Sequence, residues 1–540
     1  MTGNPLHGAT GRSLTEHHTL IRDELLRNLL DQPDRVDDLT LRVGELTVDL
    51  TRLRGDRTTL DLLAALAEEL NIPEQLAAMV RGDVVNVTEG RPALHTATRL
   101  PTGARLVVDG RDVAADVELV YERMHDFVDA VHSGEWLGST GQRIRTIVNI
   151  GIGGSDLGPR MVVRALRNYW QPGLQTRFVS NVDPADLDAA LHDLDPATTL
   201  FVVVSKTFTT TETLANATAA RAWLVGQLGE QAPAQHVVAV TAATERAIAF
   251  GVLEEAVFGF WDWVGGRFSL ASPVGLAIEL AIGSQHMTEL RAGMHTVDQA
   301  LLTQPTPNNA AILLGMLDVW YVNCFGVQSK AVVPYSQDLE LFASHLQQLQ
   351  MESNGKSVAA DGGPIDWNTS PSLWGTSGTN GQHAYFQLLH QGTDLIPLDL
   401  IAVDGSDGAS SNTENRSVML AANLVAQASA LAAGRTAEEL AADGVDASVI
   451  PHRVMRGNHP STIIHLPQLN PNCLGQLIAL YEHATVVAGF AWGINPFDQW
   501  GVERGKQLAS AFLPALAGAP IPDGTDAATR ATINAMRAST

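Results

Sequence analysis

The sequence predicts an α/β protein with two parallel β-sheets covered by helices. Short apolar runs rich in β-branched residues alternate with helical stretches in two separate parts of the chain. Continuous apolar strands of this kind are typical of parallel sheets that are buried on both faces. The 540 residues, 45% of them hydrophobic, suffice for roughly two to four domains with buried cores.

A helical N-terminal segment, 1–115, is expected to precede the first sheet and to pack on the larger domain. Residues 19–82 carry helical spacing in runs such as LIRDELLRNLLD and LDLLAALAEELN. Pro73 and Gly82 punctuate these runs. We therefore expect helices, and no strands, in this lead-in.

The first α/β domain is expected at 117–282 and the second at 310–510. Strand candidates in the first are TIVNI (146–150), RFVSN (177–181), TLFVVVS (199–205) and HVVAV (236–240). Those in the second are KAVVPY (330–335), DLIPLDLIAV (394–403) and STIIHL (461–466). Segment 404–415 is expected to be a solvated loop. A C-terminal tail, 516–540, should begin with a Pro/Gly/Asp linker at 516–524 and end in a short helix.

Charge and cysteine content limit the partners and the compartment. The formal charge is −24, from 59 acidic and 35 basic residues without a basic block, so nucleic acid and acidic membranes are poor partners. No apolar run is expected to approach the length of a spanning helix, and the N-terminus lacks an apolar signal region. Cys324 and Cys473 stand far apart, which favours a reducing compartment. We expect a cytoplasmic protein.

Lysine is used sparingly in this chain. Only four lysines occur among the 35 basic residues, and three of them lie in polar motifs: Lys206 in SKTFTTTET, Lys356 in ESNGK and Lys506 in QWGVERGK. A chain that uses arginine for most positive charges keeps lysine where a compact ammonium is needed. We interpret Lys206 and Lys506 as residues that take part in ligand binding or catalysis rather than in holding the fold together.

The junction TIVNIGIGGSDLGP, at 146–159, predicts an anion site. A buried strand runs directly into Gly151, Gly153, Gly154 and Ser155 before a helix begins. Free amides at such a turn face the positive end of a helix dipole. The glycine spacing is neither the dinucleotide fingerprint nor a Walker loop. A purely structural strand-to-helix turn remains the alternative.

The segment SKTFTTTET, from Ser205 to Thr213, predicts a phosphate site. It holds six hydroxyls and one ammonium within nine residues, directly after a strand. Open α/β sheets bind ligands at the carboxyl ends of their strands, and these groups are the donors that a phosphate accepts without any metal. A Ser/Thr-rich helix cap would explain one or two of the hydroxyls.

Three further residues carry proton-transfer or charge chemistry. Arg267 follows two glycines, where the backbone can bring a guanidinium close to a ligand. Glu352 and His383 lie in polar, turn-forming stretches, and carboxylate and imidazole are the commonest proton-transfer groups. Taken singly, a surface acid and a helix-cap histidine are the simpler interpretations. A metal pair of His383 and His390 lacks a third ligand at matching spacing.

The motifs together resemble the glucose-6-phosphate isomerase family. VNIGIGGSDLGP, SKTFTTTET, GGRFSLASPVG, MESNGK, GTNGQHA with FQLLHQG, and NPFDQWGVERGKQLA occur in the order and approximate spacing of that family. NVTEGRPALHTATR (86–99) and GNHPSTIIHLPQLNP (457–471) are also similar to it, so the resemblance covers about 85–510. It implies two flavodoxin-like, three-layer sugar-isomerase (SIS) domains. It also implies interconversion of glucose 6-phosphate and fructose 6-phosphate without a cofactor, by a homodimer with shared active sites.

The resemblance also implies a role for each matching residue. Glu352 is the base that moves a proton between C1 and C2 through a cis-enediol, and Arg267 stabilises the enediolate. His383, which the family allows to come from the neighbouring subunit, opens the sugar ring together with Lys506. Phosphate binding falls to Gly154, Ser155, Ser205, Lys206, Thr207 and Thr210. The residues that match the lining of the sugar pocket are Glu212, Gln348 and Gln499.

Departures and alternatives remain beside this interpretation. The stretch LTRLRGDR, near 50–57, and Arg504 differ from the family pattern, but neither touches a residue with an expected chemical role. An isomerase that also accepts mannose 6-phosphate would carry the same motifs. A non-catalytic sensor of sugar phosphates would need the phosphate loop but not Glu352, His383 and Lys506.

Overall fold

The computed structural model describes residues 3–404 and 411–537. The chain forms two compact units, one that ends at Pro496 and one that begins at Phe497, and each is described by itself. The first unit holds the two large β-sheets and a two-stranded pair. The unit boundary falls inside the range expected for the second domain, so the division into two SIS domains stays a prediction.

The first sheet is parallel throughout and has five strands in the order β6-β5-β7-β8-β9. Numbered along the chain from its first strand, this is the flavodoxin-like order 2-1-3-4-5. The strands are β5 (Thr146–Ile150), β6 (Gln175–Val179), β7 (Thr199–Val204), β8 (Val237–Val240) and β9 (Val257–Phe258). The order reverses between β5 and β7, and the crevice at the carboxyl ends of two such strands is where open sheets bind ligands.

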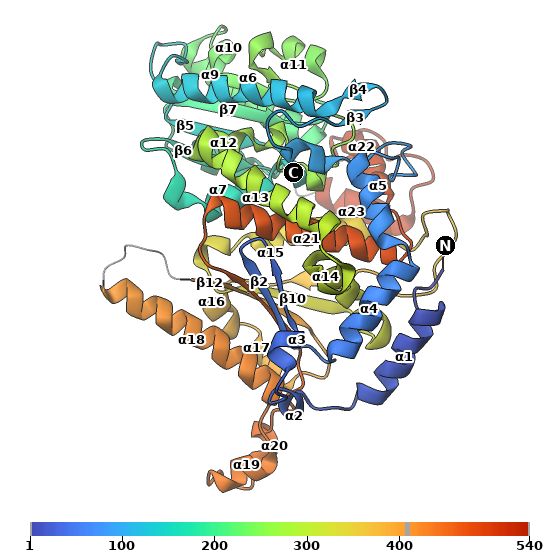
Figure 1. The fold of residues 1–540 in the computed structure, drawn as a ribbon. Coiled ribbons are helices and arrows are strands. Elements are labelled where there is room, and N and C mark those ends of the chain that lie inside the picture. The colour runs from blue at the N-terminus through green and yellow to red at the C-terminus, as the bar shows by residue number, and fades with distance from the viewer. Residues whose placement is uncertain (1–2, 405–410, 538–540) are drawn as a thin grey trace. The chain divides into compact units, whose positions relative to one another are not determined.

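Helices cover both faces of this sheet (Figure 1). On one face lie α8 (Pro184–Leu191), α9 (Thr211–Leu228) and α10 (Pro233–His236). On the other, α12 (Leu276–Ile282) packs on β5 and β6 and contacts α7 (Leu157–Ala165) and α6 (Val113–Ser133). β5, β7 and β8 are fully buried, as their continuous apolar runs predicted, whereas the edge strand β6 is buried only at Val179.

The second sheet is mixed, with six strands in the order β1-β2-β13-β12-β10-β11. Its parallel part consists of β10 (Ser329–Pro334), β11 (Ser372–Trp374), β12 (Leu398–Val403) and β13 (Ser461–Leu466). β2 (Leu46–Arg52) joins β13 antiparallel, and β1 (Thr40–Val43) pairs with β2. The predicted α/β class with parallel sheets is therefore confirmed.

The expectation of an all-helical N-terminal segment was wrong. β1 and β2 form a hairpin around Gly44 and Glu45, in which Gly44 has a φ of 55°. Leu46, Val48 and Leu50 alternate with polar residues and are buried, which is the two-residue period of a strand. The hairpin lies between two longer stretches with helical spacing, and its own two-residue alternation is too short to stand out beside them.

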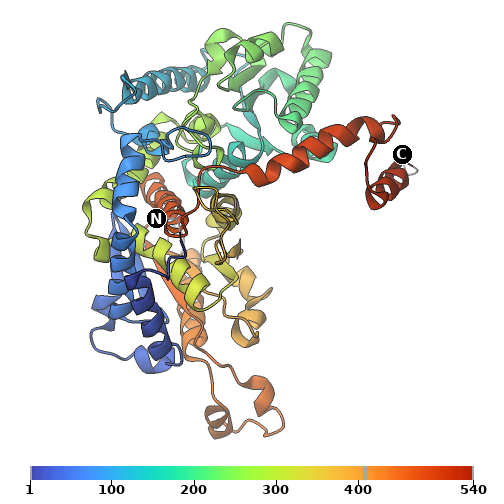
Figure 2. The ribbon, with the colours of Figure 1, turned by 90° about the vertical axis from the view of Figure 1, so that its right-hand side faces the viewer.

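The remaining elements of the first unit are mostly helical. Before α6 in the chain, besides the hairpin, are α1 (Ala9–Ile21), α2 (Leu26–Leu29), α3 (Arg35–Asp38), α4 (Arg57–Glu69), α5 (Ile72–Arg81), η1 (His95–Arg99) and the strand pair β3 (Val107–Val108) and β4 (Arg111–Asp112). Further along are α11 (Thr244–Phe250), α13 (Ser284–Thr303), α14 (Ala310–Val319), α15 (Phe342–Leu346), α16 (Gly378–Gln382), α17 (Phe386–Gln391), α18 (Ser411–Ala433), α19 (Ala437–Ala442), α20 (Ile450–Arg453) and α21 (Pro471–Ala491). α19 and α20 lie at the end of the unit away from the first sheet (Figure 1 and Figure 2).

Two details differ from the sequence-based expectations. Of the loop expected at 404–415, residues 405–410 lie outside the described residues, and α18 already begins at Ser411. α21 is long and apolar enough to cross a membrane, contrary to the expectation that no run approaches that length. However, 94% of the most apolar window of this helix is buried inside the protein, so its apolar side chains are part of the core.

The second unit contains α22 (Glu503–Leu516) and α23 (Ala527–Arg537). The linker expected at 516–524 separates these helices. Arg537 donates from Nε to the carbonyl of Ala515, and this bond ties the end of α23 back to α22.

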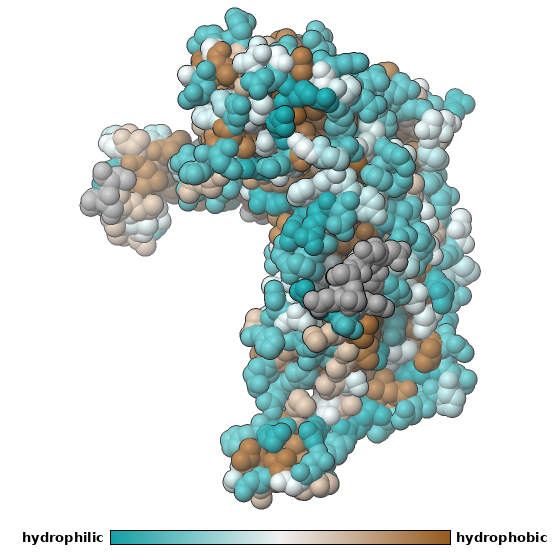
Figure 3. Space-filling view, turned by 90° about the vertical axis from the view of Figure 1, so that its left-hand side faces the viewer, coloured by the Kyte–Doolittle hydropathy of each residue, from teal (hydrophilic) through white to brown (hydrophobic). Residues whose placement is uncertain are grey.

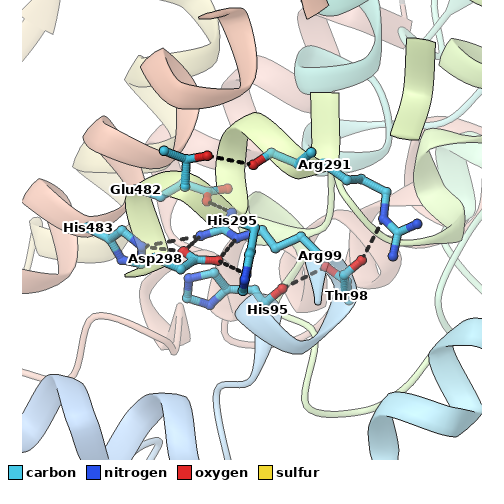
Figure 4. A network of polar contacts seen from close by, with 10 residues as sticks. His95, Thr98, Arg99, Arg291, His295, Asp298, Glu482 and His483 are labelled. Carbon is cyan, nitrogen blue, oxygen red and sulfur yellow. Dashed lines mark hydrogen bonds and ion pairs between the residues drawn. The ribbon is translucent and has the colours of Figure 1, made fainter. Parts of the chain in front are cut away.

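A buried ion cluster joins η1, α13 and α21 (Figure 4). Arg99 donates from Nε and Nη2 to the two oxygens of Asp298, each at 2.6 Å, and from Nη1 to Glu482 at 2.5 Å. His483 Nε2 lies 2.6 Å from Asp298. Burial lowers the pKa of Arg99, but Asp298 and Glu482 outweigh that effect and raise it. The guanidinium therefore compensates two carboxylates that have no access to water.

Removing this guanidinium should destabilise the first unit. We expect Arg99→Met to lower the free energy of unfolding by about 3–5 kcal/mol, because it leaves buried carboxylates without a cation. Urea denaturation of the variant and the parent measures the difference. Arg105→Met is the matched control, because Arg105 is 81% exposed and pairs loosely with Asp112. Equal losses of unfolding free energy in the two variants would show that the buried cluster stabilises the protein no more than an exposed ion pair does.

Candidate active site at the carboxyl ends of β5 and β7

Two loops lie next to each other where the strand order of the first sheet reverses. Ile150 at the end of β5 pairs with Val203 near the end of β7, so the loops that follow start side by side. The first loop contains Gly153, which has a φ of 62°. A Cβ at Gly154 would lie 2.0 Å from the carbonyl oxygen of Gly266. Only glycine therefore permits this loop to contact the segment that carries Arg267.

The second loop presents paired hydroxyls. Ser205 Oγ lies 3.1 Å from Thr210 Oγ1, and Thr207 Oγ1 lies 2.7 Å from Thr209 Oγ1. One hydroxyl donates in each pair, so the other can still donate to an anion. Phe208 has a φ of 51° and is buried against Phe250, which fixes the turn. α9 begins at Thr211, so the free amides of a long helix follow directly.

Lys206 links the hydroxyl loop to the segment before Arg267. Its Nζ donates to the carbonyls of Asp262 at 2.9 Å and Val264 at 3.2 Å. Burial, with a smaller contribution from nearby Arg91, lowers the pKa of Lys206 to about 8. The ammonium also lines a cleft of about 820 Å³ together with Arg91 and Arg246. A direct contact of Lys206 with phosphate stays a prediction.

Arg267 is buried and joins three parts of the first unit. It lies in the short turn η6 (Gly266–Phe268). Its Nε donates to Ser353 Oγ at 2.6 Å and its Nη2 to the carbonyl of Pro496 at 2.6 Å. Its Nη1 lies 3.3 Å from Glu352 Oε2. The bonds to Ser353 and Pro496 thus hold the guanidinium in place, with its Nη1 facing the Glu352 carboxylate.

Glu352 ends a π-helical turn, η11 (Gln347–Glu352). Its Oε2 accepts a hydrogen bond of 3.1 Å from Gln348 Nε2, and its side chain is 24% exposed. Gln348 also approaches the first loop, because its Nε2 would lie 3.0 Å from a Cβ at Gly153. The structure therefore brings the glycine turn, Gln348, Glu352 and Arg267 together, although they are distant in the sequence.

Other expected site residues are not joined to this cluster. His383 is exposed directly after α16, and Glu212 is half-buried in the first turn of α9. Within the described part of the chain, neither side chain has a hydrogen-bonding partner. Gln499 and Lys506 belong to the second unit, where Lys506 is 64% exposed and pairs with Glu503 at 2.8 Å. The roles of these four residues stay predictions.

Sequence reasoning missed the groups that support Glu352 and Arg267. Ser353 accepts from Arg267, and Lys356 donates to the carbonyls of Ser353 and Asn495, each at 2.8 Å. Gln350 and Lys330 lie behind the π-helical turn. A usable signal was present in Lys330, because it is the one lysine outside the polar motifs and lies in an apolar strand.

No group of three or more His, Cys, Asp or Glu side chains is placed to hold a metal ion within residues 3–404 and 411–537. Independence from metals and other cofactors stays a prediction.

Comparisons with known proteins agree on one family. The family model described as phosphoglucose isomerase matches residues 49–533. The chain is 52% identical over 524 residues to "Glucose-6-phosphate isomerase 1" of Rhodococcus jostii, covering 95% of this chain and 94% of the relative. It is 51% identical to "Glucose-6-phosphate isomerase" of Mycolicibacterium smegmatis, covering 97% of each. The crystal structure of a glucose-6-phosphate isomerase from Chlamydia trachomatis superposes with a TM-score of 0.86 at 34% identity, over 99% of this chain and 100% of that one.

The lowered pKa of Lys206 predicts how anion binding depends on pH. A sugar-acid phosphate should bind about ten-fold more weakly at pH 9 than at pH 7, because Lys206 loses its charge as the pH rises through about 8. The phosphate itself is already a dianion over this range. Titration calorimetry at several pH values measures the change. Lys206→Met should bind weakly at every pH, and Lys206→Arg should remove the pH dependence. An unchanged affinity in Lys206→Met would exclude the residue from the phosphate site.

Proposed function

Because the chain belongs to the phosphoglucose isomerase family, we propose that it interconverts glucose 6-phosphate and fructose 6-phosphate. One observation carries the proposal: Arg267 and Glu352, 3.3 Å apart, stand beside the glycine turn at the switch point of a flavodoxin-like sheet. A base and a fixed cation are thus held next to two loops that suit an anion. An aldose–ketose isomerase acting on a sugar phosphate needs these groups.

The phosphate would bind at the two loops after β5 and β7. The hydroxyls and the amides at the start of α9 supply neutral donors, and Lys206 supplies the charge. The proposed ligands of the phosphate are Gly154, Ser155, Ser205, Lys206, Thr207 and Thr210. With the phosphate held there, the sugar would extend toward Gln348 and Glu352, with Glu212 and Gln499 completing its pocket.

Catalysis would begin with ring opening, in which His383 and Lys506 move protons at the C1 hydroxyl and the ring oxygen. Glu352 would then take the proton from C2 of the open aldose, and the enediolate so formed would gain a proton at O1 to give the cis-enediol. Return of the C2 proton from Glu352 to C1, with loss of the hydroxyl proton from O2, gives the ketose. A positioned base typically contributes about 10²–10⁴-fold to such a step. Arg267 would stabilise the enediolate, by about 3 kcal/mol if it resembles an oxyanion-hole donor.

We also propose that the protein acts as a homodimer in which His383 serves the partner's site. Val418, Met419 and Val425 of α18 and Leu388 of α17 are exposed, and apolar atoms are visible over α18 (Figure 3). α16, which precedes His383, packs on α18, and Gln382 donates to Asn423 at 3.2 Å. His383 therefore lies beside an apolar face that a second copy would cover.

A cytoplasmic location is proposed from the sequence and fits the free thiols of Cys324 and Cys473.

The decisive test concerns Glu352. Glu352→Gln keeps the shape of the side chain but removes its basicity, so turnover should fall at least 10²–10⁴-fold, about the contribution of a positioned base. Exchange of the C2 hydrogen with solvent should disappear as well, while a linear sugar-acid phosphate still binds. Conversion of glucose 6-phosphate, with mannose 6-phosphate as a comparison, and hydrogen exchange in deuterated water measure these effects. Glu340→Gln is a control, because that carboxylate pairs with Arg164 instead. Persistent exchange in Glu352→Gln would mean that another residue is the base.

Subunit complementation tests the position of His383. A mixed dimer of His383→Ala and Glu352→Gln chains, purified by two different tags, should regain about half of the parent activity, because one of its two sites holds neither change. Each variant alone should be almost inactive. The control pairs Glu352→Gln with Arg267→Lys, whose residues meet within one chain, so every site keeps one defect. Absence of recovery in the first mixture would place His383 in the site of its own subunit.

A further inference from the structure

Gln350 lies on the turn that carries the proposed base. In the π-helical turn η11, residues four apart share a face and residues two apart point to roughly opposite sides. Gln348 and Glu352 share one face, as their 3.1 Å hydrogen bond shows. Gln350 is buried on the other side, where its Nε2 donates to Asp318 Oδ2 at 2.9 Å.

Behind Gln350, a buried polar network connects four further elements. Asp318 of α14 pairs with Lys330 of β10 at 3.2 Å, and Lys330 pairs with Asp399 of β12 at 3.1 Å. Tyr481 of α21 donates to Asp399 at 2.9 Å. Burial raises the pKa of Asp318 in spite of Lys330. Burial lowers the pKa of Lys330, but the two aspartates outweigh that effect and raise it.

The network gives Gln350 little freedom to move. If its amide turned away, one oxygen of Asp318 would stay buried without its donor, which is costly for a charged acceptor. Lys330 in turn holds Asp318 against the sheet through its pair with Asp399. The rotation of the π-helical turn is therefore fixed from inside the protein, opposite to the face that presents Gln348 and Glu352.

We propose that Gln350, anchored by the Asp318–Lys330 pair, is a positioning residue that aims the Glu352 carboxylate at the substrate carbons. It touches neither substrate nor reacting atoms. The proposal rests on the proposed function, because it gives Glu352 the role of base. It differs from that function in predicting an effect on proton transfer alone, with phosphate and sugar binding retained.

The test replaces the amide with an apolar group of similar shape. Gln350→Met should lower kcat about 10²-fold, because a small displacement of a catalytic group costs about that much. KM and the affinity for a sugar-acid phosphate should stay within about two-fold, since binding groups remain in place. Exchange of the C2 hydrogen with solvent should fall together with kcat.

Gln476→Met is the matched control. Gln476 is equally buried, donates to Asn472 at 2.5 Å and accepts from the amide of Glu45 at 2.8 Å, far along α21 from the π-helical turn. It should lose stability without losing kcat. If Gln350→Met fails to fold, Gln350→Asn, which keeps a shorter amide, should show the same separation of kcat from KM at about ten-fold.

The outcomes separate this inference from the proposed function. A parent enzyme that does not isomerise glucose 6-phosphate would overturn the function. An active parent, an inactive Glu352→Gln and a fully active Gln350→Met would overturn the positioning role only. A Gln350 variant that loses kcat and substrate binding equally, or no more kcat than Gln476→Met, would also overturn it.

Discussion

The site depends on the fixed position of the Arg267 guanidinium. Its bonds to Ser353, Glu352 and the carbonyl of Pro496 join the segment after the first sheet to the π-helical turn and to the end of the first unit. A buried guanidinium must satisfy its donors, and here backbone and side-chain oxygens do so before any substrate arrives. In the proposed reaction, charge that develops beside Glu352 would therefore meet a cation that needs no reorganisation.

The close approach of Gly154 to Gly266 makes that arrangement possible. The loop after β5 can reach the Arg267 segment only where no Cβ intervenes, and Lys206 ties the loop after β7 to the same segment through the carbonyls of Asp262 and Val264. The loops after β5 and β7 thus both contact the residues that directly precede Arg267. If phosphate binds at these loops as proposed, these contacts would couple its binding to the orientation of Arg267.

The strands of the first sheet and the motifs that follow them could be predicted from the sequence, because both depend on short continuous segments. Apolar runs such as TIVNI and TLFVVV became β5 and β7, and the motifs that follow them lie together as parallel topology requires. The hairpin of β1 and β2 was missed because its alternation is short and lies between helices. The contacts of Gln350 and Lys330 with Asp318 could not be predicted, because they join separate elements of the chain and no sequence motif links those elements. Lys506 and Gln499 are in a unit of their own, so their part in the site still rests on the motif alone.

Two buried ion networks, around Arg99 and Lys330, meet on one helix, α21. Glu482 and His483 belong to the first network and Tyr481 to the second. Buried ion pairs often contribute little net stability compared with apolar packing, so stability alone does not explain their presence. Their donors and acceptors, however, can be satisfied in few arrangements, which fixes the rotation of α21 against α13 and against the second sheet. Asn354, two residues after Glu352, donates to the carbonyl of Thr485 on the same helix at 2.9 Å. The segment that carries the proposed base is therefore held against α21, and the buried ion networks fix the rotation of that helix.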